Sequence, residues 1–279
     1  MYNPDITQVI RLINSLSQQV DKIVVIDNSL IASAKSKIGP VTEYLHHPEN
    51  IGIAAAHNIG LKRLKSEKFE YALLLDQDSN ISNDMVFKLS SLHVASQRAG
   101  QSVIAIGPRV ICSFSDKPVK PLIQREIYEF DELIYVTQII SSGMLIWLEH
   151  IEKVGYKDES LFIDGVDHEW CWRAKSVSLN VAIAKKVEML HRLGDARRKF
   201  VGVTMKVGSP IRLYYQFRNI LLLSRRPYVP LYWKVRNLAL MPLRMLANSC
   251  LHENSLQRIK FMFRGIIDGI RGKSGRYKK

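Results

Sequence analysis

Two aspartates separated by one residue follow a short apolar segment near the start of the chain. Asp76 and Asp78 come directly after residues 71–75, a run typical of a buried β-strand. Ligands of open α/β sheets collect outside the carboxyl ends of the strands, so both carboxylates are expected where a ligand binds. Their oxygens suit Mg²⁺ or Mn²⁺, ions that bind diphosphates in turn. The pair therefore predicts a metal site for a phosphorylated ligand, with a turn and helix cap before Ser82 as the alternative.

The elements that must hold these carboxylates alternate between helices and strands. Apolar spacing predicts helices over residues 6–16, 52–64 and 83–99, and strands over residues 22–26, 71–75 and 102–106. This alternation predicts an α/β fold with a Rossmann-like, mostly parallel sheet flanked by helices. Such a sheet normally begins with a strand, whereas the first predicted element here is a helix. We therefore expect that the first strand is missing.

The pattern is looser after Pro108. It includes a strand-like stretch at residues 133–148 and predicted helices at residues 149–154 and 167–176. The strand-like stretch is too short and too polar to predict a membrane span. Ser142 and Gly143 within it are candidates to border a sugar or an acceptor, although small residues are also common packing choices. This part is expected to form the acceptor side of a cleft.

Charge and cysteine content narrow the class of protein. The 279 residues carry a net charge of +14, but 19 Lys or Arg and only two acids lie in residues 197–279. The mixture of Lys or Arg with Tyr and Trp in this tail favours an amphipathic helix at an anionic membrane surface. A solvated helical cap and a nucleic-acid interface are the alternatives, and we do not expect nucleic acid as a partner. The three cysteines are far apart and form no C-x-x-C motif, which indicates a reducing, cytoplasmic setting.

Several short motifs, taken in order, resemble the family 2 inverting glycosyltransferases of GT-A fold, especially the bacterial rhamnosyltransferases. The motifs are Tyr2-Asn3-Pro4, residues 25–28 (VIDN), Glu49-Asn50-Ile51-Gly52 through Asn58-Ile59-Gly60, Asp76-Gln77-Asp78, Ser142-Gly143, residues 162–173 (FIDGVDHEWCWR) and residues 191–195 (HRLGD). The resemblance implies a GT-A glycosyltransferase domain over residues 1–196, followed by a basic, amphipathic helical region over residues 197–279.

The resemblance also implies a nucleotide-sugar site at the strand ends. It assigns Asp27 to the nucleotide base, the loop of Asn50 and Gly52 to the space beneath it, and Asp76 to the ribose. Without the resemblance, Asn50 and Gly52 indicate a turn and a helix cap equally well. The complete set of predicted nucleotide-sugar residues is Tyr2, Asn3, Asp27, Asn50, Gly52, Asn58 and Asp76.

A divalent metal follows from the same resemblance. Asp78 is expected to be the direct ligand of Mg²⁺ or Mn²⁺, with Asp76 beside it and His191 completing the metal or phosphate shell. The metal would stabilise the negative charge of the leaving nucleoside diphosphate. A structural histidine near a turn is the alternative for His191.

The carboxylates before the helix at residues 167–176 are the expected catalytic group. Aligned on the family pattern, Asp167 takes the position of the general base that removes the proton of the acceptor hydroxyl. Val166 stands where the family usually has Glu, so Glu169 could share the work and Asp164 could cap the helix. The alternative is the ordinary enrichment of acids at a helix N-terminus, which the helix dipole favours.

Together these features predict an inverting sugar transferase of bacterial surface polysaccharide synthesis, such as that of O-antigen. The expected donor is dTDP-L-rhamnose, and the expected acceptor is a polyprenyl-diphosphate-linked glycan. We expect a cytoplasmic protein, peripheral at the cytoplasmic face of the bacterial inner membrane and bound to anionic lipid through residues 197–279. The alternatives are a family 2 transferase for another nucleotide sugar, or a truncated, inactive protein that binds the membrane surface.

Overall fold

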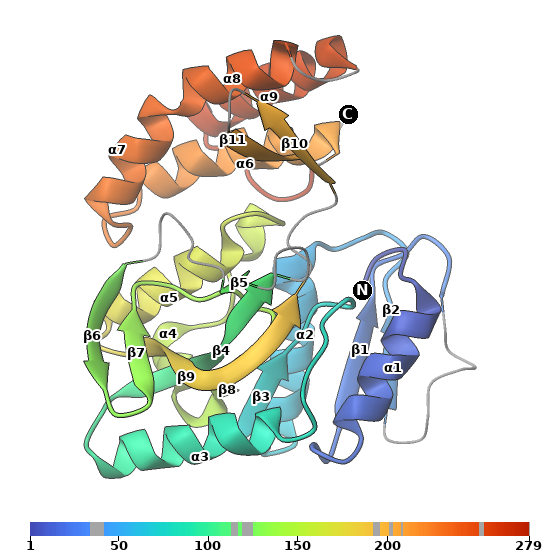
Figure 1. Cartoon of the computed structure of the whole chain (residues 1–279). Coiled ribbons are helices and arrows are strands. Elements are labelled where there is room, and N and C mark those ends of the chain that lie inside the picture. The colour runs from blue at the N-terminus through green and yellow to red at the C-terminus, as the bar shows by residue number, and fades with distance from the viewer. Residues whose placement is uncertain are drawn as a thin grey trace.

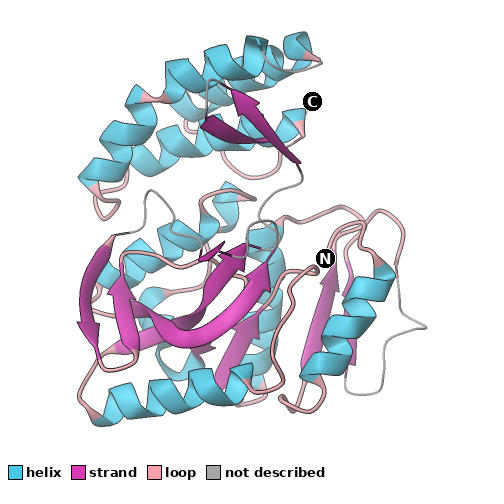
Figure 2. Cartoon of the chain, in the orientation of Figure 1, coloured by secondary structure: helices cyan, strands magenta, loops and turns pink. Residues whose placement is uncertain are grey.

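The computed structural model describes residues 1–33, 42–112, 117–118, 125–191, 196–200, 203–207, 209–250 and 254–278. The described part has a central β-sheet with helices on both faces and a helical layer at one end of the sheet (Figures 1 and 2). One hydrophobic cluster joins the sheet to α2, α4 and α5, and a second joins it to α1 and α3. The predicted α/β fold is therefore confirmed.

The first elements follow the predicted order. They are α1 (Ile6–Leu16), β1 (Ile23–Asp27), β2 (Thr42–His46), α2 (Ile53–Ser66), β3 (Tyr71–Leu74), α3 (Met85–Arg98) and β4 (Val103–Cys112). Strand β2 was not predicted, because its five residues are all half-buried and give no alternating pattern. Helix α1 begins after Asp5, whose carboxylate accepts a hydrogen bond from the backbone N–H of Thr7.

The next elements carry the acceptor side of the site. They are β5 (Lys117–Pro118), β6 (Glu126–Phe130), β7 (Leu133–Val136), β8 (Met144–Trp147), the 3-10 helix η2 (Leu148–His150), α4 (Ile151–Val154), the 3-10 helix η3 (Glu159–Leu161), α5 (Val166–Ser176) and β9 (Asn180–His191). The stretch at residues 133–148 is thus two strands with a turn between them. The turn includes Gly143, whose φ of +81° suits glycine and few other residues.

The sheet is mixed, so the prediction of a mostly parallel sheet is wrong. Six strands run in the order β3-β8-β4-β9-β7-β6, and β5 adds to β4. Only β4 and β9 are parallel in this sheet; β8 lies between β3 and β4 and is antiparallel to both. The turn at Gly143 sends β8 back alongside β3, a long-range pairing that apolar periodicity does not reveal.

Strands β1 and β2 form a separate parallel pair. A cavity of about 470 Å³ lies between β1 and β3, and its lining includes Ile26, Leu61 and Leu74. At one end of the cavity the amino group of Met1 donates a hydrogen bond to the carbonyl oxygen of Ile26 (2.5 Å). The cavity therefore separates β1 from β3.

The last part of the chain is mostly helical. It contains β10 (Ala196–Phe200), β11 (Val203–Val207), α6 (Pro210–Ser224), α7 (Leu231–Ala239), α8 (Met241–Cys250) and α9 (Ser255–Ile270). The helical prediction for residues 197–279 holds from Pro210 onward and is wrong for the antiparallel hairpin β10–β11. No helix in the described residues is long and apolar enough to cross a membrane.

The helical layer shares a hydrophobic cluster with the first part of the chain. Trp172 of α5 packs edge-on against Trp233 of α7, with ring centroids 5.1 Å apart. The same cluster includes Ala54 of α2 and Phe217 of α6. The division at residue 196 stays a prediction, but the two parts pack directly on each other.

Candidate active site

The turn at residues 141–143 brings the two groups of predicted acids together. The Ser142 hydroxyl lies 2.6 Å from the Ser79 hydroxyl and accepts a hydrogen bond from the backbone N–H of Asp76 (3.5 Å). The neighbouring Ser141 donates both its backbone N–H (3.1 Å) and its hydroxyl to the carboxylate of Asp167. Asp76 and Asp167 are thus tied to adjacent residues of one turn.

The acids after β3 influence one another electrostatically. Burial raises the pKa of Asp76 to about 6, and the negative charges of Asp167 and Asp78 add to the effect. A bound cation would relieve this repulsion, so the two aspartates fit a divalent metal by their chemistry. Asp76 and Asp78 are both half-buried, which leaves them accessible to a ligand.

The third predicted metal ligand is only partly placed. His191 is the last residue of β9, and its side chain is outside the described residues. The backbone N–H of Asn80 bonds the carbonyl oxygen of Leu190 (3.3 Å), so the end of β9 runs beside the loop that carries Asp78. Among the side chains that are described, no group of three His, Cys, Asp or Glu residues is arranged to hold a metal.

Asp167 lies in the first turn of α5 beside a buried lysine. The ammonium of Lys157 is 3.8 Å from the Asp167 carboxylate and 3.3 Å from the Ser141 hydroxyl, and the Lys157 side chain is fully buried. Burial alone would raise the pKa of Asp167, but the positive charge of Lys157 and the bonds from Ser141 lower it overall. Asp167 is therefore ionised at neutral pH and can accept a proton.

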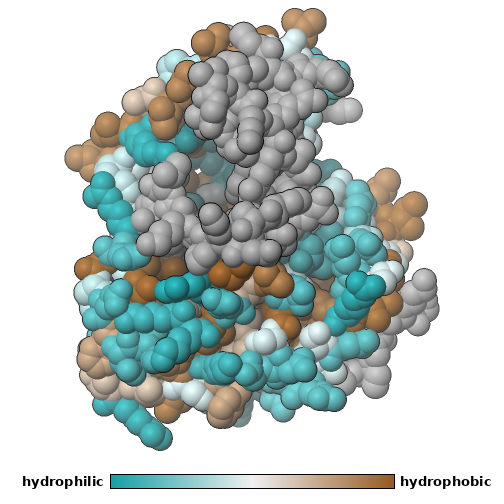
Figure 3. All heavy atoms as spheres, viewed as in Figure 1, coloured by the Kyte–Doolittle hydropathy of each residue, from teal (hydrophilic) through white to brown (hydrophobic). Residues whose placement is uncertain are grey.

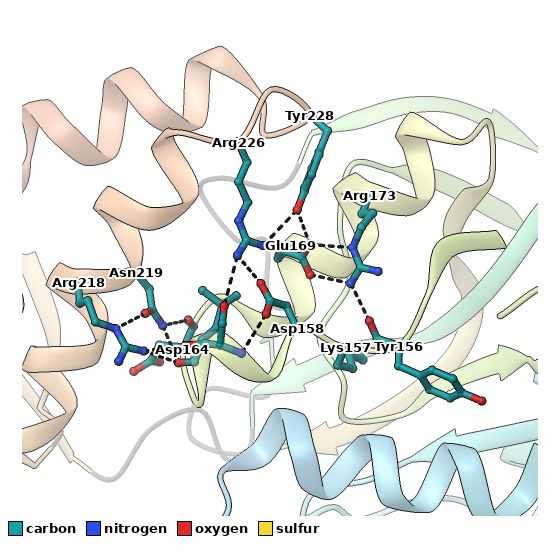
Figure 4. Close-up of polar contacts among 12 residues, drawn as sticks. Tyr156, Lys157, Asp158, Asp164, Glu169, Arg173, Arg218, Asn219, Arg226 and Tyr228 are labelled. Atoms are coloured by element: carbon teal, nitrogen blue, oxygen red, sulfur yellow. Dashed lines mark hydrogen bonds and ion pairs between the residues drawn. The ribbon is translucent and has the colours of Figure 1, made fainter. Parts of the chain in front are cut away.

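Glu169 lies among the side chains of Arg173, Arg226 and Tyr228 (Figure 4). Its side chain is 1% exposed and accepts bonds from Arg173 (2.8 Å) and from the Tyr228 hydroxyl (2.6 Å). The guanidinium of Arg226 lies 3.2 Å from the same carboxylate. A buried carboxylate with three such partners is not available to an acceptor, so the prediction that Glu169 shares the role of base does not fit the geometry.

Asp164 also has a partner from the C-terminal helices. Arg212 of α6 forms a two-pronged ion pair with the Asp164 carboxylate, with a closest approach of 2.8 Å. Asp164 does not cap α5 with its side chain; the residue at the N-cap is Gly165. Asp167 is left as the carboxylate of this group that fits a general base.

The predicted nucleotide-base residue Asp27 is buried at the end of β1. Its carboxylate accepts bonds from the backbone N–H groups of Ser29 and Ser33 (2.9 Å each) and from the Tyr44 hydroxyl. Burial alone would raise the pKa of Asp27, but these bonds lower it well below its ordinary range. The charged carboxylate is thereby held rigidly at the strand end.

The loop of Asn50 and Gly52 contacts Asn28, the residue after Asp27. The side chain of Asn28 donates to the carbonyl oxygen of Gly52 (3.2 Å), and the side chain of Asn50 accepts from the N–H of Gly52 (3.1 Å). Gly52 has a φ of +86°, and a Cβ there would come within 2.6 Å of the Phe162 ring. Glycine is therefore required by both conformation and space.

The N-terminal residues connect the two strand ends. The backbone N–H of Tyr2 donates to the side chain of Gln77 (2.7 Å), and that of Asn3 donates to the Ser29 hydroxyl (2.8 Å). The Tyr2 side chain is 54% exposed. Tyr2 and Asn3 therefore lie between β1 and β3, where a nucleotide-sugar site was predicted.

Asn58 has a structural role rather than an exposed one. It is buried in α2 and makes two bonds with the backbone of Lys157, both 2.8 Å long, and one with the Glu159 carboxylate (2.7 Å). These bonds leave little of Asn58 for a nucleotide, so its predicted binding role does not fit the geometry. Asn58 instead fixes the backbone of the lysine that faces Asp167.

Two sets of site residues were not predicted from the sequence. Lys157 gives no signal, because a single lysine in a loop is usually solvated. The other set is Arg218 and Asn219 of α6, which bind the loop before α5. Their mixture of charge and neighbouring aromatic rings was interpreted as a membrane surface, although both side chains are buried.

Comparisons with known proteins identify the family of the chain. Residues 1–144 match the family described as Glycosyl transferase family 2. The chain is 32% identical to a dTDP-rhamnosyl transferase, RfbF, of Shigella flexneri, over 98% of this chain and 94% of that protein. It is 22% identical to Agl10 of Haloferax volcanii, described as a low-salt glycan biosynthesis hexosyltransferase, over 92% of this chain and 85% of that protein.

Solved structures with little sequence identity share the fold. The structure of GalNAc-T7 with UDP, GalNAc and Mn²⁺ matches 97% of this chain and 55% of that one, with a TM-score of 0.57 and 13% identity. Residues 1–349 of Staphylococcus aureus TarS match 96% of this chain and 79% of that one, with a TM-score of 0.55 and 13% identity. By its family match and its extended identity to a member, the chain belongs to glycosyl transferase family 2 and is a glycosyltransferase of GT-A fold.

Proposed function

We propose that the protein transfers L-rhamnose from dTDP-L-rhamnose to a polyprenyl-diphosphate-linked glycan, with inversion at the anomeric carbon. The main observation in support of the proposed reaction is the turn at residues 141–143, which brings Asp76 and Asp167 into one site. The choice of donor and of sugar is supported by the identity to a dTDP-rhamnosyl transferase. The lipid-linked acceptor follows from the sequence resemblance to rhamnosyltransferases of surface polysaccharides.

In this proposal Asp167 accepts the proton of the acceptor hydroxyl as that hydroxyl attacks the anomeric carbon. Lys157 and Ser141 keep Asp167 ionised and oriented. Asp76 and Asp78 would hold Mg²⁺ or Mn²⁺, which would offset the negative charge of the departing diphosphate. A single displacement of this kind inverts the sugar carbon and requires no covalent nucleophile.

Calorimetric titration tests the donor site before any acceptor is known. The full chain is titrated with dTDP and with UDP, each with and without Mn²⁺. Metal-dependent binding that favours dTDP supports the proposed donor. A preference for UDP points to another nucleotide sugar, and no binding to either nucleotide supports the inactive alternative. Release of dTDP from dTDP-L-rhamnose, measured with a panel of polyprenyl-diphosphate-linked saccharides, then tests the transfer.

We also propose that α7, α8 and α9 rest on an anionic membrane surface, at the cytoplasmic face of the inner membrane. The aromatic and basic residues Tyr214, Tyr215, Arg218 and Trp233 cannot contribute as we expected, because all four are buried. The support for a membrane contact comes instead from exposed apolar residues of these helices. Exposed apolar side chains on these helices include Leu231, Val235, Leu243, Leu246, Leu256, Phe263, Ile267 and Ile270.

The apolar side chains on α9 follow helical spacing. Leu256, Phe263, Ile267 and Ile270 are separated by seven, four and three positions, so they form one exposed stripe, and the exposed Lys260 lies within it. Figure 3 shows apolar residues along the outer edge of this helical layer. The stripe lies in residues 197–279, which contain 19 Lys or Arg and only two acids. The positive charge of this region favours binding to anionic lipid.

Flotation with vesicles tests this surface. The full chain should float with vesicles of phosphatidylglycerol and phosphatidylcholine and should float less with pure phosphatidylcholine. Phe263→Asp combined with Ile270→Asp should abolish flotation. Phe87→Asp is the matched control, since Phe87 is 74% exposed on α3, outside the helical layer. Equal flotation of the double variant and the control would contradict the proposed surface.

A further inference from the structure

Two consecutive polar residues of α6 are buried and point into the loop before α5 (Figure 4). The side-chain NH₂ of Asn219 lies near the carbonyl oxygens of Leu161 (3.0 Å), Ile163 (2.7 Å) and Asp164 (2.8 Å). Arg218 donates to the carbonyl oxygens of Leu161 (2.9 Å) and Ser160 (3.3 Å). The two side chains therefore hold four of the five carbonyl groups of residues 160–164.

Arg218 also orients Asn219. Its Nε donates to the side-chain oxygen of Asn219 (3.0 Å), so the amide of Asn219 turns its NH₂ toward the loop. The described hydrogen-bond partners of this guanidinium are carbonyl and amide oxygens rather than a carboxylate. Burying a positive charge among neutral dipoles is costly, and a hydrophobic residue would serve packing alone at lower cost. The arrangement therefore points to a role beyond packing.

The loop that they hold has a strained backbone. Phe162 and Asp164 both have a φ of +64°, a conformation that costs free energy for residues other than glycine. The N-terminus of α5 follows immediately, and Asp167 is three residues after Asp164. The conformation of the loop thus sets where the first turn of α5 begins.

The same loop also contacts the donor side of the site. The carbonyl oxygen of Phe162 accepts a hydrogen bond from the N–H of Ile53 (2.9 Å), and the Phe162 ring fills the space above Gly52. On its other face the Phe162 ring stacks on Tyr215 of α6, with centroids 4.8 Å apart. One strained loop therefore joins α6, the predicted nucleotide loop and the base.

We infer that Arg218 and Asn219 are positioning residues for sugar transfer, which hold Asp167 at a set distance from the donor loop at Gly52. The inference rests on the proposed function in taking Asp167 as the base. It gives α6 a role inside the active site, separate from any contact of the helical layer with lipid. Loss of the Asn219 amide should let the loop relax and move Asp167 without removing any group that binds the donor.

The test compares Asn219→Leu with Asn237→Leu. Both asparagines are buried in the helical layer, but the hydrogen bond that the Asn237 amide donates within the described part of the chain stays inside α7, to the carbonyl oxygen of Trp233 (2.9 Å). At a temperature where both variants are folded, kcat with dTDP-L-rhamnose should fall on the order of 10- to 100-fold for Asn219→Leu. The donor KM and dTDP affinity should stay within about threefold, and Asn237→Leu should keep the wild-type kcat.

Hydrogen exchange gives a readout that does not depend on activity. The amides of residues 160–167 should exchange faster in Asn219→Leu than in the wild type, while those of α3 should not change. If the wild type shows no turnover, the proposed function fails and the exchange experiment still tests the positioning role. Asn219→Ser, a milder change, replaces Asn219→Leu should that variant not fold. Wild-type kcat, or unchanged exchange of this loop, in a folded Asn219 variant would overturn the inference.

Discussion

Asp27 on the donor side and the loop before Asp167 on the base side are stabilised by contacts of different range. On the donor side, Asp27 is held by Ser29, Ser33 and Tyr44, all within 17 residues of it. On the base side, the loop before Asp167 is bound by side chains of α6 that lie 55 to 58 positions later. The comparison teaches that a short segment can hold Asp27 in place, whereas the loop before the base depends on the C-terminal helices.

Among the variants that test this comparison, the one that lacks the general base should show the largest effect, a fall in kcat. Asp167→Asn keeps the shape of the side chain but cannot accept the proton, so kcat should fall by about 10²- to 10⁴-fold. Calorimetry should find dTDP binding close to that of the wild type, because the substitution keeps the shape of the side chain and removes no predicted donor-binding group. Near-wild-type turnover would contradict the assignment of the base and would return attention to the neighbouring acids.

Removal of the expected metal ligand, Asp78, should affect the donor side. Asp78→Asn should weaken metal-dependent dTDP binding roughly tenfold or more, because the amide lacks the negative charge with which a carboxylate binds a divalent cation. The measurement is calorimetric titration over a series of Mn²⁺ concentrations. Asn80→Asp changes the charge of the same loop two positions away, and it is the control for a general effect of charge on binding. If Asp78→Asn binds dTDP and Mn²⁺ as the wild type does, the metal assignment fails.

The electrostatic link between Lys157 and Asp167 should appear in the pH profile. Lys157 lowers the pKa of Asp167, so Lys157→Met should raise that pKa. A base must be deprotonated to act, and the acidic limb of kcat/KM should therefore move to higher pH. A shift of about one unit corresponds to about 1.4 kcal/mol of lost interaction. Lys88→Met on α3 should leave the limb in place, and an unmoved limb in Lys157→Met would show that the lysine does not act on the base.

The smallest expected effects are on the free energy of unfolding, at two glycines of the donor side. Gly60 lies inside α2, and a Cβ there would meet its nearest neighbour, Ile26, at 3.8 Å, so Gly60→Ala should stabilise the fold by about 0.5–1 kcal/mol. Gly52→Ala should destabilise it, because of the positive φ and the clash with Phe162. Urea unfolding measures both. Equal effects of the two changes would contradict the packing described around Gly52.

Local pattern was enough to predict the elements of the donor side other than β2. The apolar run at β3 followed by Asp76 and Asp78, and the helical spacing of α1, are properties of a few adjacent residues. The order of the strands could not be predicted in the same way. Strand β8 lies between β3 and β4 because of pairing across more than 30 residues, and the sequence of β8 carries no mark of its partners.

Residue roles were harder to predict than residue positions. Asn58 and Glu169 occupy places close to the site, but their hydrogen-bond partners, Lys157 in one case and Tyr228 in the other, come from distant segments. Arg218 was placed on a membrane surface because basic and aromatic neighbours suit both a lipid interface and a buried cluster of rings and guanidinium. Only the packing of α6 on the loop distinguishes the two.

The separation of β1 and β2 from the larger sheet has a consequence for cooperativity. No described strand joins β1 to β3 by backbone hydrogen bonds, and a cavity lies between them. Units with few such bonds open at a lower free energy than the rest of a fold. We therefore expect β1 and β2, with Asp27, to form a subglobal unfolding unit. A nucleotide that binds only its closed form would shift that local equilibrium by mass action, so the donor would act as a folding ligand for its own site.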